Sequence, residues 1–82
     1  MDDGALIALL LDALRRLDVE VRTEPLPESP IGAGAICILH GRPTLFLDTR
    51  APVHDQVDAL LRALRTLETD DVFLHPAVRS RL

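Results

Sequence analysis

The chain has almost no aromatic residues: it contains two phenylalanines and neither tryptophan nor tyrosine among 82 residues. Aromatic rings are the usual platforms on which proteins stack single-stranded bases, so their scarcity argues against that class of binder. The sequence is nevertheless 48% hydrophobic, which is too apolar for a disordered segment. We therefore expect a core of Leu, Ile, Val and Ala within a single domain that covers residues 1–82.

Cysteine is also scarce, and basic residues are outnumbered by acidic ones. Cys37 is the only cysteine, so no disulfide can form within the chain. Nine basic residues, all arginine, stand against thirteen acidic ones, and the net charge is −4. A chain without a basic stripe is not expected to bind nucleic acid or an anionic membrane. The apolar run 5–11 is too short to span a bilayer, and the acidic start Met1-Asp2-Asp3 differs from a secretion signal, so we expect a cytoplasmic protein.

Motifs with a known chemistry are missing as well. The sequence has no Walker loop, no H-E-x-x-H and no G-x-S-x-G. Gly32-Ala33-Gly34 is similar to part of a dinucleotide-binding turn, but it lacks the third glycine and precedes a strand instead of joining a strand to a helix. We therefore predict no catalytic residue, no metal site and no cofactor.

The central stretch 35–48 is the most informative part of the chain. It predicts a β-hairpin that turns near Gly41-Arg42-Pro43, with its last strand at 44–47. A hairpin with one face in water alternates apolar and polar residues, whereas this one is apolar on both faces. We expect the chain's own helices to cover one face and a second subunit to cover the other.

Helices are predicted on both sides of the hairpin. Asp2 or Asp3 can cap a first helix at about 4–17, which is apolar nearly all round and is therefore expected to be buried on more than one side. A second helix, starting at Pro52, carries a regular apolar stripe. The members of that stripe are Val53, Val57, Leu60, Leu61, Leu64 and Leu67.

The remaining segments complete the predicted fold. Residues 19–22 alternate as a half-exposed strand, the proline-rich segment 24–30 is a loop, 72–74 is a candidate edge strand, and Pro76 can start a last helical turn through Leu82. The order is helix, three strands, helix and a short C-terminal turn or helix. This order predicts an α+β domain with a three-stranded antiparallel sheet.

Several titratable residues offer candidate chemistry. Cys37 and His40 have a C-x-x-H spacing, but an odd separation places them on opposite faces of a regular strand. We favour a buried core cysteine and a turn histidine. A second set would combine three histidines with two aspartates: His40, His54, His75, Asp48 and Asp55. We favour surface polar residues, with the aspartate of the second helix favourable at the positive helix end.

Four arginines are candidate contacts for a carboxylate or phosphate: Arg62 and Arg65 on the second helix, and Arg79 and Arg81 in the tail. A solvated face or the rim of an interface is the simpler interpretation. The anion contacts that we retain as candidates are Arg62, Arg65 and Arg79.

The order of elements resembles the minimal core of the ImmA/IrrE-type metallopeptidases, in which a helix, an I-x-V strand and a hairpin precede a helix that begins near a proline and carries H-E-x-x-H. Residues 19–21, 44–48 and 52–65 would occupy those places here. Where the zinc motif would stand, this chain has Leu61-Arg62-Ala63-Leu64-Arg65. The resemblance therefore implies a protease-like fold without the zinc ligands or the general base. Residues 34–48 also resemble a G-x-C-x-L-x-G-x-x-x-L-F-L-D pattern of short uncharacterised bacterial proteins, except that two residues separate Gly34 from Cys37.

These observations favour a non-catalytic cytoplasmic interaction module that forms a homodimer or is a small subunit of a larger assembly. Its partner would be a second copy or another protein, with no role for nucleic acid or membrane. The alternative is a small enzyme or ligand-binding protein that uses Cys37, His40, Asp48 or His54. The candidate interface residues are apolar positions of the first helix and the hairpin: Leu6, Ile7, Leu10, Leu14, Ile36, Ile38 and Phe46.

Overall fold

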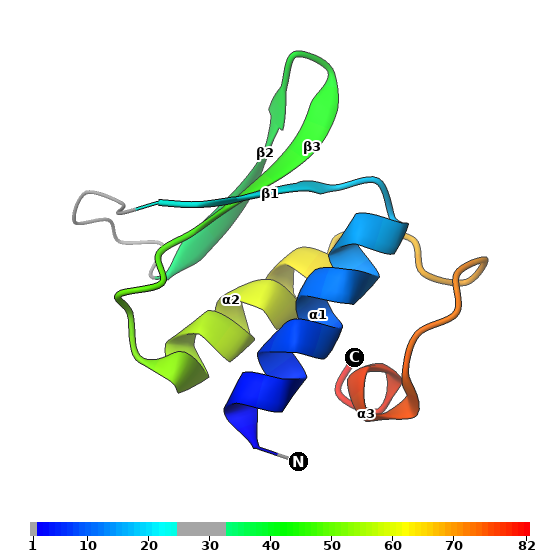
Figure 1. Cartoon of the computed structure of the whole chain (residues 1–82). Coiled ribbons are helices and arrows are strands. Elements are labelled where there is room, and N and C mark those ends of the chain that lie inside the picture. The colour runs from blue at the N-terminus through cyan, green and yellow to red at the C-terminus, as the bar shows by residue number, and fades with distance from the viewer. Residues whose placement is uncertain (1, 25–32) are drawn as a thin grey trace.

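The protein is described by a computed structural model that covers residues 2–24 and 33–82. In chain order the elements are α1 (Asp3–Arg16), β1 (Glu20–Thr23), β2 (Gly34–Leu39), β3 (Arg42–Leu47), α2 (Val53–Arg65) and α3 (Pro76–Arg79). The strands form one sheet, and α1 and α2 lie side by side against one of its faces (Figure 1). This arrangement confirms the predicted α+β class. Within the described ranges, no helix is long and apolar enough to cross a membrane.

Strand order is where the structure departs from the predicted sheet. The order is β1-β3-β2, so the sheet is mixed: β2 pairs with β3 antiparallel, but β1 pairs with β3 in parallel. The fully antiparallel prediction is wrong because β3 lies between the two strands that precede it. The central place goes to the most buried strand, in which Thr44 and Leu45 are 0% exposed and Leu47 is 1% exposed.

The β2–β3 turn lies slightly earlier than predicted. It consists of His40 and Gly41, with φ values of 53° and 79°, the two left-handed positions of a type I′ hairpin turn. Arg42 and Pro43, predicted in the turn, belong to β3. Pro43 is tolerated there because the side on which it lacks an N–H faces β1, and β1 begins to pair with β3 only at Thr44.

Helix α1 is capped by Asp2, whose Oδ1 accepts a hydrogen bond from the Ala5 N–H at 2.7 Å. Its fully buried residues form one stripe, and the apolar residues that flank the stripe are half-buried against the same core, so the buried face is narrower than predicted. The stripe consists of Leu6, Leu10, Ala13 and Leu14.

Helix α2 carries the predicted apolar stripe into the core. Val57, Leu60, Leu61 and Leu64 are buried against α1 and the sheet, whereas Val53 at the start of the helix is 46% exposed. Leu61 is therefore a core residue at the position where the metallopeptidase resemblance would place a metal ligand.

The predicted edge strand at 72–74 does not form. This segment packs against the core through Val72 and Leu74, and Arg79 bonds the carbonyl oxygens of Thr69 and Val72 at 3.0 and 2.9 Å. Within the segment, the Val72 carbonyl oxygen therefore accepts from a side chain of α3. The last helix, α3, ends at Arg79, earlier than predicted.

Candidate interaction surface

The free edge of β2 is the first component of the candidate surface. In the order β1-β3-β2, no strand of the described chain pairs with the outer side of β2. The β2 sequence, Gly-Ala-Ile-Cys-Ile-Leu, contains neither a charged residue nor a proline. Monomeric proteins usually protect an exposed sheet edge with charges, prolines or bulges. The edge of β2 has no charge or proline of its own.

The alternation of hydrogen-bonded and non-bonded pairs along β2 and β3 shows which β2 residues direct their backbone N–H and C=O groups to the free edge. The Asp48 N–H donates to the Ala33 carbonyl oxygen at 2.7 Å, and these residues continue the β2–β3 register by one step. Antiparallel pairs alternate between bonded and unbonded, so Ala35, Cys37 and Leu39 bond to β3. The N–H and C=O groups of Ile36 and Ile38 therefore point away from the sheet.

The side chains along this edge are apolar and partly exposed. Ile38 is 68% exposed. Cys37 is an exposed free thiol, so the prediction that it is a buried core residue is wrong. The exposure of Ile38 follows from geometry, because the hairpin extends past the two helices that cover the rest of the sheet (Figure 1). Ile36, nearer the base of the hairpin, is half-buried against the core.

The opposite edge of the sheet, formed by β1, has a different character. Its short strand carries Glu20 and Arg22, whose side chains approach to 3.8 Å. Both residues pair with β3 on the face of the sheet away from the helices, Glu20 opposite Thr44 and Arg22 opposite the half-buried Phe46. The charged residues of β1 therefore protect this edge against pairing with a further strand.

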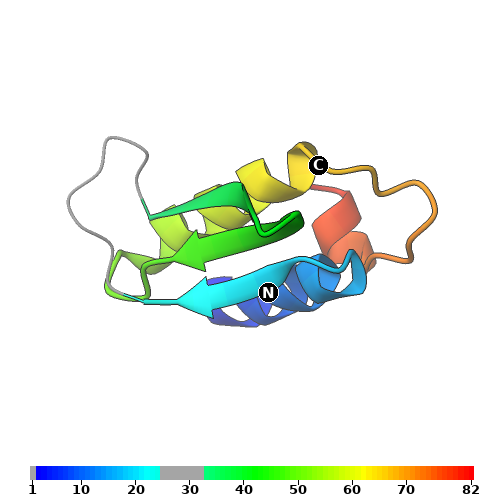
Figure 2. The same cartoon turned by 90° about the horizontal axis from the view of Figure 1, so that it is seen from above.

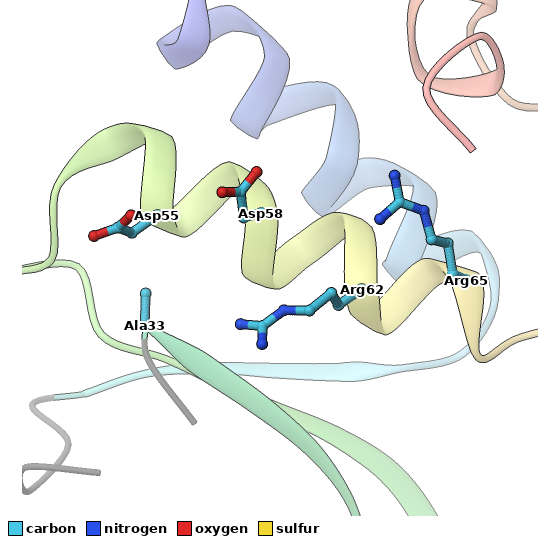
Figure 3. Close-up of a pocket in the computed structure, with 5 residues that line it drawn as sticks. All are labelled: Ala33, Asp55, Asp58, Arg62 and Arg65. Carbon is cyan, nitrogen blue, oxygen red and sulfur yellow. The ribbon is translucent and has the colours of Figure 1, made fainter. Parts of the chain in front are cut away.

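A shallow depression on α2 lies next to the base of β2. It has a volume of about 510 Å³ and is lined by Ala33, Asp55, Asp58, Arg62 and Arg65. Figure 3 shows the two carboxylates on the N-terminal half of the helix and the two guanidinium groups on the C-terminal half. Figure 2 shows α2 beneath the β2 side of the sheet, and Gly34, at the start of β2, lies next to Ala59 in the middle of the helix.

The structure divides the predicted interface residues into two groups. Leu6, Leu10 and Leu14 are at most 4% exposed in the chain's own core, so they cannot contribute to a surface, and this part of the prediction is corrected. The other members remain at least partly exposed. They are Ile7, Ile36, Ile38 and Phe46.

The three arginines predicted as anion contacts also differ in their surroundings. Arg79 is occupied inside the chain by the Thr69 and Val72 carbonyl oxygens and the Thr69 hydroxyl. Arg65 donates through Nη2 to the Arg81 carbonyl oxygen at 2.9 Å. Arg62 and Arg65 share their depression with two aspartates, so it carries no excess of positive charge for an anion.

The residues of the alternative, enzymatic hypothesis are spread over the molecule. His40 lies in the turn at one end of β3 and Asp48 at the other, roughly 20 Å apart at the usual rise per residue. His54 contacts Asp55 at 3.0 Å on α2. Asp48 binds Arg50 and raises its pKa, first by the hydrogen bond and then by its charge. In the described residues, no three His, Cys, Asp or Glu side chains are grouped so that they could hold a metal ion.

The sequence analysis did not predict the structural roles of two side chains, Gln56 and His75. Gln56 is 7% exposed and donates from Nε2 to the carbonyl oxygens of Ala51 and Thr49, at 2.8 and 3.2 Å, which fixes the β3–α2 connection. His75 accepts the Ala77 N–H on Nδ1 at 3.0 Å and caps α3. Only the position of His75 directly before a proline gave a sequence signal, since proline favours the first turn of a helix.

The chain was compared with known protein families, with curated proteins and with solved structures, and none of them matches it significantly.

Proposed function

We propose that the chain is a non-catalytic interaction module that binds protein through the free edge of β2. It would act in the cytoplasm as a homodimer or as a small subunit of a larger assembly. The observation that carries the proposal is the uncharged edge of β2, which presents the N–H and C=O groups of Ile36 and Ile38 beside the exposed Ile38 side chain. An added strand would pair with these groups, which is a common way for a sheet to recognise a polypeptide.

Two further features support this proposal. The exposed thiol of Cys37 fits a reducing compartment, where a free cysteine persists. The candidate catalytic residues are distributed over β2, the hairpin turn and both ends of the β3–α2 connection. A binding surface therefore agrees with the geometry better than a reaction centre does.

Migration on a native gel tests the proposal in extracts of the cells that produce the chain. The protein should migrate as a complex larger than the 9.0 kDa chain. Ile38→Lys should release the monomer, because a lysine on the edge opposes strand addition. Phe73→Lys is the matched control, since Phe73 is equally apolar and 72% exposed but lies outside the sheet. A wild-type chain that migrates as a monomer in the extract overturns the proposed function.

A further inference from the structure

We infer that the strand that completes the β2 edge is β2 of a second copy, related to the first by a two-fold axis through Cys37. The inference rests on the proposed function and names its partner. Two antiparallel β2 strands would join two three-stranded sheets into one continuous sheet, with the helices of both copies on the same face.

The register of this pairing follows from the direction of the backbone groups. Ile36 and Ile38 present their N–H and C=O groups at the edge, so each must form a hydrogen-bonded pair with a residue whose own N–H and C=O groups also point to the free edge. A two-fold axis at Cys37 pairs Ile36 with the other copy's Ile38, and Ile38 with its Ile36. The contact is isologous, and because Ile36-Cys37-Ile38 reads the same in both directions, isoleucine meets isoleucine on each side of the axis.

Side-chain size favours this register over its nearest alternative. An axis at Ile36 would place the exposed Ile38 opposite Gly34, which has no side chain to cover it. An axis at Cys37 places isoleucine opposite isoleucine on the helix-side face and Ala35 opposite Leu39 on the other. Every cross-strand pair is then apolar, and no charges of like sign meet along the strands.

Sedimentation equilibrium of the purified chain tests the partner. The expected mass is twice the 9.0 kDa of one chain for wild type and for Phe73→Lys, and one chain for Ile38→Lys. A purified wild-type monomer that still forms a larger complex in cell extract overturns the dimer and leaves the proposed function standing. A monomer in both settings overturns both.

Cysteine cross-linking tests the register. When two thiols join as a disulfide, two copper(II)-phenanthroline complexes accept one electron each and the solvent accepts the two protons. Cα atoms opposite each other in an unbonded pair lie about 4.5 Å apart, within disulfide reach, so wild type should give a reducible covalent dimer. Ile36→Cys in a Cys37→Ser chain should cross-link at least several-fold more slowly. Faster cross-linking through position 36 than through 37 overturns the register.

Discussion

Strands β2 and β3 have the same length of six residues and are both predominantly apolar, yet they are buried to very different extents. Leu45 and Thr44 of β3 are completely buried, whereas Ile38 of β2 is 68% exposed. Place in the fold, more than composition, separates the two strands, because β3 has a neighbour on each side and β2 has one, and because Ile38 lies where the hairpin extends past the helices. The comparison shows how an apolar strand can be structural in one position and a contact surface in the next.

The difference between β3 and β2 in their contribution to the free energy of unfolding should be largest when a side chain is shortened in each strand. Leu45→Ala should lower the free energy of unfolding by about 2–5 kcal/mol, because it leaves a cavity in the core. Ile38→Ala should cost less than about 1 kcal/mol in the monomer, where the lost side chain is mostly in water. Urea unfolding at low protein concentration measures both. Similar losses for the two variants would contradict the different roles assigned to the strands.

Proline substitution should show which backbone amides of β2 bond to β3 and which point to the free edge. Cys37→Pro removes an N–H that bonds to β3 and should cost about 1–3 kcal/mol. Ile38→Pro removes an N–H that points to the free edge and should destabilise the monomer less. The two sites are adjacent and both exposed, so each serves as the other's control in the same urea experiment. A larger loss at Ile38 would show that the opposite set of amides faces β3.

The turn that joins β2 to β3 offers a smaller test. Gly41 has a φ of 79°, and a side chain there should cost about 1–2 kcal/mol. Gly41→Ala should therefore lower the midpoint of thermal unfolding. His40→Asn should leave it nearly unchanged, since asparagine accepts the left-handed backbone of this position. A Gly41→Ala protein as stable as wild type would argue against the type I′ turn.

Amide hydrogen exchange followed by NMR should detect the smallest expected effect, a difference in exchange rate between neighbouring amides of β2. In the monomeric Ile38→Lys variant, the Ile36 N–H should exchange faster than the Cys37 N–H, which is bonded to β3. In wild type, the Ile36 N–H should become slower as the protein concentration rises. A concentration-independent rate at Ile36 would leave β2 without a partner strand.

The elements that sequence periodicity predicts best are those whose burial is decided locally. The α2 stripe at Val57, Leu60, Leu61 and Leu64 is buried as predicted because a 3.6-residue repeat has only one helical interpretation. Strand order was not predictable in this way. Whether β1 pairs with β2 or with β3 depends on contacts distant in sequence, and the alternation of residues 19–22 fits either neighbour.

The candidate surface was predictable only in part, for a related reason. Hydrophobicity marks Leu10 and Ile38 alike, but only the fold shows that Leu10 packs inside the chain and Ile38 does not. The role of Arg79 was hidden because the carbonyl oxygens of Thr69 and Val72 that it binds come together only after folding. The resemblance to metallopeptidases stays a prediction about the order of elements.

Pro43 has a consequence for growth of the sheet. It lies beside Thr44 on β3, where β1 begins to pair, and without an N–H it cannot donate to a strand that arrives from the β1 side. Together with the charged Glu20 and Arg22 of β1, it leaves the sheet extendable in one direction only. Once two copies have joined along β2, both outer margins of the combined sheet are of the protected kind. Assembly of this apolar hairpin would then terminate at a closed pair instead of propagating into a fibre.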